Sequence, residues 1–380
     1  MYCYIPIAKV GKSFLTVGAN FRLGIDLIRP YHTIILLMFK NVNNVQRGCY
    51  NIGMEITAIT DRTAWDEFVT ASPWGHPLQL WGWGETKASG NWTPYRLALL
   101  EDGKIVAGVQ LLLWKLPKIN KFIVYAPRGP VSEPGSKLTD ILLEEVVKWA
   151  RAHGGLYVRI EPAWASGAPA GWKKSANSIQ MRETYTIDLR KSEDEIMEPM
   201  SRKHRQYIRK AERDGVSVRR IEPGQTGVMF ELYVDTAQRA GFGIHGEGYY
   251  KKLSQALGEN NYLYEASFEE KPVAFLWLAA AGRTAYELYG GVNAAGGEIK
   301  ANYTLKWQAI QAMKAAGYEI YDFNGRLNEG VSRFKDGFGP DETDWIGTYD
   351  YPLNAPLYHA WEKLWPLAKP VGRMLRKIKG

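Results

Sequence analysis

The distribution of apolar and polar positions predicts one succession of elements that occurs twice along the chain. Its first occurrence comprises a hairpin, a strand, a helix and a second strand, at residues 95–115, 122–131, 137–153 and 156–162. The same elements follow in the same order at residues 262–281, 285–293, 302–316 and 318–325. In each, the alternation of a strand gives way to the amphipathic spacing of a helix. Asp102-Gly103 has the composition of a tight hairpin turn.

Short matches between the two occurrences indicate a duplicated unit. Lys104-Ile-Val-Ala107 corresponds to Lys271-Pro-Val-Ala274, and Gly129-Pro-Val131 corresponds to Gly290-Gly-Val292. A chain of 380 residues also exceeds what one core usually serves. We therefore expect an α/β (α+β) protein of two similar domains, each a mixed sheet flanked by helices. The alternative is that the same order of elements recurs by chance.

The two expected domains do not begin at the first residue. Residues 1–53 show no sustained period of a strand or a helix, whereas residues 54–60 alternate and Thr60 or Asp61 is suited to cap a helix. We expect residues 1–53 to be a poorly ordered extension, and an alternative start at Met54 would account for it. The first domain is expected to comprise residues 54–188 with about 350–380, and the second residues 189–349.

Charge and cysteine content narrow the function classes. The formal charge of +8 arises at the ends: residues 1–53 carry six basic residues against one acidic, and residues 369–380 carry five basic residues and no acidic one, so residues 54–368 have a net charge of −2. A site for polyanions must therefore be local. The only cysteines are Cys3 and Cys49, which excludes a thiolate metal site or a cysteine nucleophile in the body. No apolar run approaches the ~18–20 residues of a spanning helix.

The strongest local charge lies between the two repeats, in a segment that reads as a helix. Four arginines are spaced by 3, 4 and 4 positions and so share one helix face: Arg202, Arg205, Arg209 and Arg213. Guanidinium groups match phosphate geometry, which favours a phosphate or tRNA contact. The alternative is a solvated helix whose cations favour its C-terminus.

Glycine-rich segments at strand ends supply further candidates. Lys87 follows Trp81-Gly-Trp-Gly84, which we interpret as an aromatic turn, and Arg128 follows a strand, so either cation is placed to bind a phosphate or carboxylate. For Trp81 and Trp83, a position in the core is favoured over stacking on a ligand. The segment 333–339 reads as a closing turn that places Lys335 between two aromatic residues, suited to stabilise an oxyanion or phosphate, although an ordinary loop lysine would look the same.

Two carboxylates occupy equivalent strand ends of the repeats, Glu161 in the first and Asp322 in the second. Such positions suit a general base, or an ion pair with a neighbouring lysine. We interpret Asp322 as structural. Motifs for nucleotide-binding loops, metalloproteases and serine hydrolases are absent from the sequence, and no cofactor or metal is expected.

Together, five motifs resemble the Fem family of peptidoglycan bridge aminoacyltransferases. They are Q-L-W-G-W-G-E-T-K, Y-A-P-R-G-P-V, R-K-H-R-Q-Y-I-R-K-A-E-R-D-G-V, Y-D-F-N-G and F-K-D-G-F-G, in the order and approximate spacing of that family. The resemblance, which covers residues 54–357, implies two tandem domains of the GCN5-related N-acetyltransferase type. It implies transfer of an amino acid from aminoacyl-tRNA to an amine of the peptidoglycan stem peptide. Many members carry a coiled-coil arm, for which residues 215–241 leave no room.

The resemblance also assigns roles to individual residues. It makes Lys335 and Phe334 the place where the tRNA acceptor end and the oxyanion are bound, and Glu161 a candidate to position or deprotonate the acceptor amine. The residues implied to contact the acceptor or line the channel are Lys87, Tyr249, His245, Tyr286 and Tyr289. His245 departs from the family pattern, because relatives often have an arginine there.

The acceptor is expected to be a nucleotide-linked or lipid-linked muropeptide. The basic tail, with Met374, Leu375 and Ile378, suits an anionic membrane surface and favours the lipid-linked form. We expect a monomeric cytoplasmic enzyme that contacts the inner face of the membrane. The alternatives are an acyl-CoA N-acyltransferase and a non-catalytic protein that binds tRNA or muropeptide.

Overall fold

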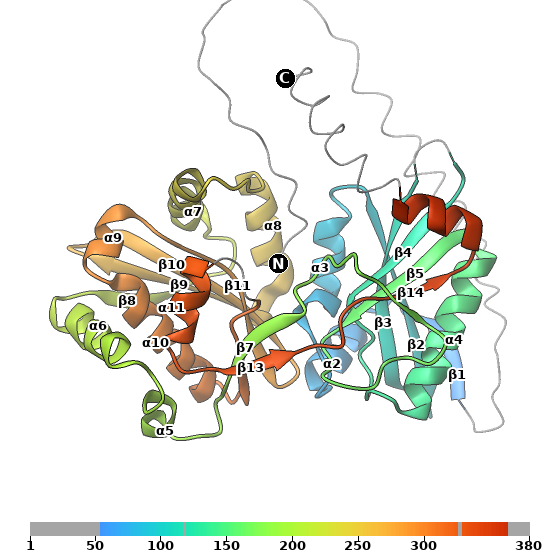
Figure 1. The fold of residues 1–380 in the computed structure, drawn as a ribbon, viewed down its shortest axis with the longest axis horizontal. Coiled ribbons are helices and arrows are strands. Elements are labelled where there is room, and N and C mark those ends of the chain that lie inside the picture. Colours follow the sequence, from blue (N-terminus) through green and yellow to red (C-terminus); the bar gives the residue numbers. More distant parts are fainter. Residues whose placement is uncertain (1–53, 117–118, 326–328, 364–380) are drawn as a thin grey trace, which may run out of the picture.

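The computed structural model describes residues 54–116, 119–325 and 329–363, and forms two mixed sheets that lie side by side (Figure 1). The sequence expectations for residues 1–53 and for the basic tail lie outside the described residues. Each sheet has seven strands and is flanked by helices, so the predicted fold class is confirmed.

The first sheet has the strand order β1-β2-β3-β4-β5-β14-β6. Its strands are β1 Met54–Ala58, β2 Trp92–Glu101, β3 Lys104–Lys115, β4 Phe122–Arg128, β5 Gly155–Pro162, β6 Lys173–Lys174 and β14 Tyr349–Pro352. Its helices are α2 Arg62–Ala71, η1 Pro77–Gln79, α3 Trp81–Lys87 and α4 Lys137–Ala152, and residues 355–363 are also helical. The predicted hairpin turn joins β2 to β3, and both Asp102 and Gly103 have positive φ, at 49° and 76°.

The second sheet has the strand order β13-β7-β12-β11-β10-β9-β8. Its strands are β7 Glu183–Asp188, β8 Ser217–Ile221, β9 Asn261–Phe268, β10 Lys271–Ala281, β11 Thr284–Val292, β12 Ile320–Asp322 and β13 Asp341–Asp344. Its helices are α5 Glu193–Met197, α6 Arg202–Arg213, α7 Gly227–Ala240, α8 Glu247–Leu257, η2 Gly258–Asn260, α9 Ala294–Glu298, α10 Ala301–Ala315 and α11 Glu329–Asp336. A capping box begins α5, with Ser192 and Glu195 bonded reciprocally.

The two sheets repeat the same plan. In the first, β4 and β5 pair in parallel, and in the second β11 and β12 do the same. A parallel pair needs a crossover, which α4 supplies in the first unit and α10 in the second. The lysines that begin β3 and β10, Lys104 and Lys271, occupy equivalent places as expected. The observed order therefore supports a duplicated unit.

Each sheet includes one strand that is separated in sequence from the other strands of its unit. β7 precedes the second unit and pairs with β12 and β13, whereas β14 returns to pair with β5 in the first sheet. Residues 183–188 therefore belong to the second sheet, although the sequence placed them in the first domain. We propose a boundary before Glu183, with residues 349–363 belonging to the first unit.

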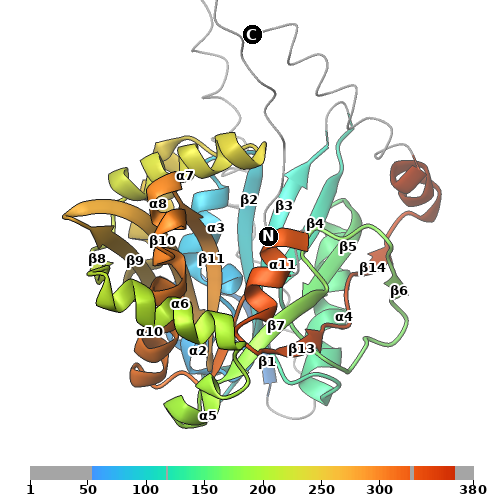
Figure 2. The same ribbon diagram turned by 60° about the vertical axis from the view of Figure 1, so that its left-hand side comes forward.

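The two units are joined by one apolar cluster. Trp65, Leu80 and Trp83 from the first unit pack with Tyr250 and Trp277 from the second. Figure 2 shows α2 and α3 of the first unit beside the strands of the second sheet. Residues that project into the seam between the units are thus held by both sheets.

The segment from Trp81 to Lys87 is helix α3 rather than the predicted aromatic turn. Its glycines serve close packing: a Cβ on Gly82 would lie 2.0 Å from the carbonyl oxygen of Ala256 in α8. Glycine was read as a turn signal, whereas here it allows two helices from different units to approach. Trp83 is buried in the shared cluster and Trp81 is partly buried, in agreement with the core alternative.

The predicted closing turn at 333–339 is also largely helical, because α11 extends to Asp336. The turn follows at Gly337, where a Cβ would lie 1.8 Å from Cε1 of His204, and at Gly339, whose φ is 67°. These two glycines permit the chain to leave α11 tightly against α6.

The prediction that the chain lacks a coiled-coil arm is confirmed for the described residues. The region where an arm was considered holds β8, α7 and the approach to α8, and α7 and α8 have 14 and 11 residues. Within residues 54–363 and outside the two short gaps, no helix is long and apolar enough to cross a membrane.

Candidate functional site

Three of the predicted acceptor-binding residues come together at the seam between the units. Lys87, the last residue of α3, donates a hydrogen bond from Nζ to the hydroxyl oxygen of Tyr249 in α8 at 2.7 Å. The Nζ atom also lies 4.6 Å from the ring of Trp83. His245 stacks on Tyr249 with ring centroids 4.0 Å apart. Burial, and next the positive charge of Lys87, lower the pKa of His245, so the neutral imidazole is favoured.

An aromatic cluster in the second unit, from α8 and β11, supports this group. Tyr250 contacts Tyr249 edge to face at 5.4 Å, and its hydroxyl accepts a hydrogen bond from the backbone N–H of His245 at 3.1 Å. Tyr289 of β11 packs against Tyr250 at 5.2 Å. Tyr289 therefore packs behind the group that contains Lys87 and supports it.

A second group of polar residues lies at the adjoining strand ends. Arg128 ends β4 with a φ of 56° and donates to the carbonyl of Met181 at 2.8 Å. Its positive charge acts on His76, Tyr286 and Asp322. The rings of His76 and Tyr286 lie 4.1 Å apart. Arg128 and His76 come from the first unit and the other two from the second, so the group also spans the seam.

Asp322 is buried within this second group. Its carboxylate accepts hydrogen bonds from the Thr184 hydroxyl at 2.5 Å and the Asn324 N–H at 2.6 Å. Burial raises the pKa of Asp322, and these two hydrogen bonds oppose the rise. The carboxylate fixes the end of β12 to β7, which agrees with a structural role.

Lys335 faces inward from α11 and is only 5% exposed. Its Nζ donates to the carbonyl oxygens of Phe323 and Gly325 at 2.6 and 2.7 Å. An ammonium has three N–H donors, so within the part of the chain that the structure describes one is left for a further acceptor. Burial lowers the pKa of Lys335 to about 8, and the Glu287 carboxylate partly offsets this effect. Phe334 beside it is half-buried and contacts Tyr303 edge to face at 5.0 Å.

Sequence reasoning missed a buried ion pair next to Lys335. Glu287 of β11 and Lys306 of α10 are paired, and the Tyr321 hydroxyl donates to the same carboxylate oxygen at 2.6 Å. The signal was present in the sequence, because Glu287 interrupts an apolar strand and Lys306 lies between Leu305 and Trp307 on a buried helix face. A buried charge is rare enough that both positions merited attention.

Glu161 lies at the end of β5, equivalent to Asp322, but its carboxylate is surrounded by donors. Hydrogen bonds come from the Tyr125 hydroxyl at 2.5 Å, the Ile179 and Gln180 N–H groups at 2.7 and 3.0 Å, and the Thr348 hydroxyl at 2.7 Å. Four donors hold the carboxylate in one fixed position. Its predicted contact with the acceptor amine stays a prediction.

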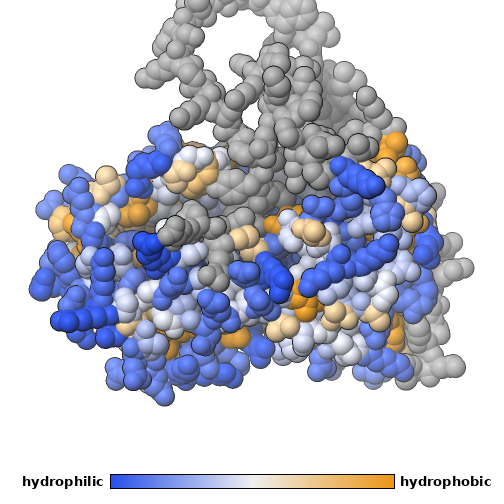
Figure 3. Space-filling view, in the orientation of Figure 1, coloured by the Kyte–Doolittle hydropathy of each residue, from blue (hydrophilic) through white to orange (hydrophobic). Residues whose placement is uncertain are grey.

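The predicted arginine face lies on α6 at one end of the second unit. His204, Ile208 and Ala211 form the buried side of the helix, and Arg202, Arg209 and Arg213 are exposed. Arg205 differs, because it donates to the carbonyls of Glu198 and Met200 at the end of α5. Hydrophilic residues cover this end of the molecule (Figure 3).

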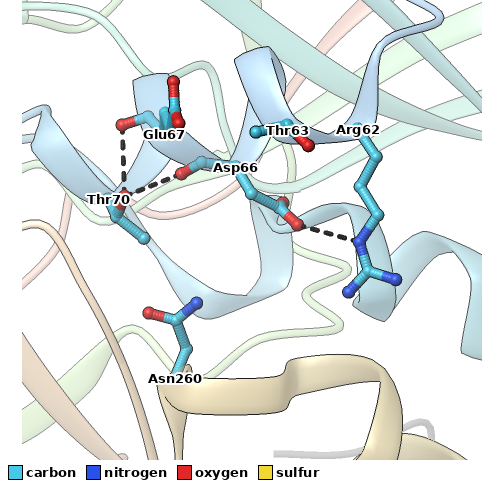
Figure 4. A pocket seen from close by; sticks show the side chains of 6 residues that line it. All are labelled: Arg62, Thr63, Asp66, Glu67, Thr70 and Asn260. Carbon is cyan, nitrogen blue, oxygen red and sulfur yellow. Dashed lines mark hydrogen bonds and ion pairs between the residues drawn. The ribbon is translucent and has the colours of Figure 1, made fainter.

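One open hollow of about 360 Å³ lies elsewhere along the seam, between α2 and η2. It is lined by Arg62, Thr63, Asp66, Glu67, Thr70 and Asn260 (Figure 4). Arg62 and Asp66 bind each other at 3.3 Å there, and none of the predicted site residues contributes. The parts of the chain that the structure describes contain no group of three or more His, Cys, Asp or Glu residues arranged to hold a metal ion.

Comparison with known proteins agrees with this arrangement. The lipid II:glycine glycyltransferase of Staphylococcus saprophyticus is 27% identical to this chain, and the alignment covers 86% of this chain and 100% of that protein. The protein of the same name from Staphylococcus haemolyticus is 26% identical, with 83% and 97% covered. Because both relatives are named as glycyltransferases, the predicted enzyme class, a transferase of amino acids, is confirmed.

A solved structure shares the fold. A crystal structure of FemX superimposes with a TM-score of 0.75 and 23% sequence identity, covering 81% of this chain and 100% of that one. The model of the FemAB family matches three successive stretches, residues 60–170, 167–271 and 264–364. These stretches contain both sheets and both groups of residues at the seam, so the chain belongs to the FemAB family.

Proposed function

We propose that this protein transfers an amino acid from an aminoacyl-tRNA to an amine of a lipid-linked peptidoglycan precursor. The observation that carries the proposal is the inward-facing Lys335, which two backbone carbonyls hold in place. Among the described residues, its third N–H donor has no acceptor. In a member of this family, such a cation is suited to bind the oxygen that becomes negative when an amine attacks an ester. We propose that the reaction takes place on the cytoplasmic side of the membrane, because charged tRNA is available there.

The donor is expected to approach over α6 and α10. Tyr207, Tyr303 and Phe334 contact each other edge to face in sequence, with ring centroids 5.0 Å apart at both steps. Lys203 and Lys300 both lie near the ring of Tyr207, at 5.5 and 5.4 Å. Aromatic rings with cations between them are typical of surfaces that bind single-stranded RNA. This path leads from the exposed arginines of α6 to Phe334 and Lys335.

The acceptor is expected at the seam, near Lys87 and Tyr249. Lys87 carries the positive charge that a diphosphate needs, and its contact with Tyr249 fixes the ammonium between the two units. The choice of a lipid-linked acceptor rests on the relatives, whose names give lipid II as substrate. We propose that Arg128, Tyr286 and Tyr289 shape the channel between the acceptor and donor sites.

The chemistry requires no covalent enzyme intermediate. The acceptor amine attacks the ester carbonyl of the aminoacyl-tRNA, forming a C–N bond while the carbonyl oxygen gains negative charge. The C–O bond to the ribose then breaks, and the leaving oxygen takes the proton that the amine gives up. Orientation of the two reactants and stabilisation of the oxyanion by Lys335 supply the main catalytic effects.

The experiment that tests the proposal compares Lys335→Met with a matched variant, Lys314→Met. Lys314 also donates to two backbone carbonyls, those of Leu189 and Lys191, at 2.8 and 2.7 Å. We expect Lys335→Met to lower the rate of transfer by roughly 100-fold or more, with acceptor affinity within a few-fold of wild type. Lys314→Met should retain near-normal transfer. Equal rates in both variants and wild type would remove Lys335 from the reaction.

A further inference from the structure

The buried pair Glu287–Lys306 is the feature of the second unit that the proposed chemistry does not yet use. Glu287 is 8% exposed and Lys306 5% exposed. Glu287 lies on the face of β11 that packs against α10, opposite the face that carries Tyr286 and Tyr289. The pair therefore lies behind the channel wall, outside both groups of residues at the seam.

Each member of the pair touches a part of the chain that holds Lys335. Lys306 Nζ lies 4.8 Å from the ring of Phe323 and 5.4 Å from the ring of Phe334, so its charge rests between β12 and α11. Glu287 accepts from Tyr321 through its carboxylate and from the Asn324 side-chain amide, at 2.7 Å, through its backbone carbonyl. These contacts fall on residues 321, 323 and 324, within and directly beside the segment whose carbonyls at 323 and 325 accept from Lys335.

Stability alone is a weak reason for such a pair. Burying two charges costs several kcal/mol of desolvation for each ion, and apolar replacements of similar volume are often neutral or stabilising. The first unit contains a comparable pair, Arg159–Asp350, which is 6% and 0% exposed and joins β5 to β14. That pair binds Ser175 and Glu362 and contacts none of the predicted donor-site residues. It provides a matched control for the second unit.

We propose that Glu287 and Lys306 are positioning residues that fix the place and the protonation state of Lys335 from behind the donor site. This inference rests on the proposed function only for its catalytic consequence; the effect on Lys335 itself is measurable in the protein alone. The charged groups that act on Lys335 come from three elements: Glu287 on β11, Lys306 on α10 and Asp322 on β12.

The first test measures the titration of Lys335 in the full chain, by NMR of ¹³C-labelled lysine side chains. Glu287 raises the pKa of Lys335 and Lys306 lowers it. Glu287→Gln should therefore lower the pKa of Lys335, and Lys306→Met should raise it. The signal is assigned by its absence in Lys335→Met. If the two substitutions only loosen the fold, both variants should shift the pKa of Lys335 in the same direction or leave it unchanged. Either result would overturn the proposal.

The second test keeps the proposal falsifiable if a single variant fails to fold. Glu287→Gln combined with Lys306→Met removes both charges and leaves no buried charge without a partner. Its kcat should fall by about tenfold or more, with the KM for the acceptor unchanged, because only the donor side is displaced. Arg159→Met combined with Asp350→Asn should lose as much thermal stability or more, without this selective loss of kcat.

The outcomes separate this inference from the proposed function. A wild-type protein that transfers no amino acid from any charged tRNA contradicts the proposed function, while opposite pKa shifts would still support the positioning role. A wild-type protein that transfers normally, with a double variant of unchanged kcat and pH profile, contradicts the positioning role alone.

Discussion

Lys87 and Tyr249 are 162 residues apart in sequence, yet Nζ of the first lies 2.7 Å from the hydroxyl oxygen of the second. The contact joins α3 of the first unit to α8 of the second. It is possible because Gly82 lets α3 approach the backbone of α8. A cation that residues of both units hold in place is well placed to contact a ligand bound between the units.

The first prediction concerns this contact. Lys87→Met should raise the KM for the lipid-linked acceptor by roughly tenfold, because a charge-assisted contact to a phosphate is lost, with kcat little changed. The matched control is Lys252→Met, because Lys252 also reaches across the same helices, to the hydroxyl of Ser89. Steady-state kinetics with varied acceptor makes the comparison. A normal KM in Lys87→Met would contradict the assignment.

The second prediction concerns the exposed face of α6. Arg209→Ala combined with Arg213→Ala should weaken tRNA binding and make it less dependent on salt, with a slope reduced by about 1 for each lost phosphate contact. Arg190→Ala is the control, because Arg190 is exposed but bound to Asp188 at 2.8 Å. Binding measured over a series of salt concentrations tests this. An unchanged slope would show that α6 does not contact the phosphates.

The third prediction concerns pH. Burial places the pKa of Lys335 at about 8, so the ammonium form predominates below that pH and is lost above it. If the ammonium stabilises the oxyanion, the rate advantage of wild type over Lys335→Met should decline above pH ~8, by up to tenfold per pH unit. The ratio of the two rates cancels the titration of the acceptor amine and the lability of the ester. A ratio that stays constant from pH 7 to 10 would contradict a role for the charge.

The fourth prediction separates two roles for Glu161. Glu161→Gln places an amide group among four hydrogen-bond donors, so we expect a loss of about 1–3 kcal/mol in the free energy of unfolding. The folded fraction should transfer amino acid at a nearly normal rate. A general base would behave in the opposite way, with a rate loss of roughly 10²–10⁴-fold and little change in stability. Thermal unfolding and kinetics on the same preparation decide between them.

The fifth prediction tests the packing between the units. Gly82→Ala should destabilise the protein by about 1–3 kcal/mol, because its Cβ would lie 2.0 Å from the carbonyl oxygen of Ala256. Gly90→Ala is the control, since the nearest atom to its Cβ is 3.5 Å away. Equal melting temperatures in the two variants would contradict the close approach of α3 and α8.

Much of the fold was predictable from local patterns. The Asp102-Gly103 turn and the helices α4 and α10 all follow from short segments whose residue pattern favours one conformation. The pairing of β7 with the second sheet was not predictable, because nothing within a strand specifies which distant strand it joins. The helices at Trp81 and Glu329 were read as turns because glycine marks both tight turns and close packing.

The candidate site likewise combines features that the sequence predicts with features that only the folded chain specifies. The family resemblance implied roles for Lys87, Tyr249 and Lys335, and the structure brings the first two together. The pairing of Glu287 with Lys306 depends on which faces of β11 and α10 meet, which only the folded chain specifies. The donors around Glu161 likewise come from residues 125, 179, 180 and 348, in three separate parts of the chain.

The most direct test of the account is mass spectrometry of a lipid-linked muropeptide after incubation with the protein and a panel of charged tRNAs. We predict that the mass of one amino acid residue is added to the stem-peptide amine, with at least one of the tRNAs. Ribonuclease treatment of the donor should abolish the addition. Addition from an acyl-CoA in place of charged tRNA, or no addition with any tRNA, would contradict the proposed function.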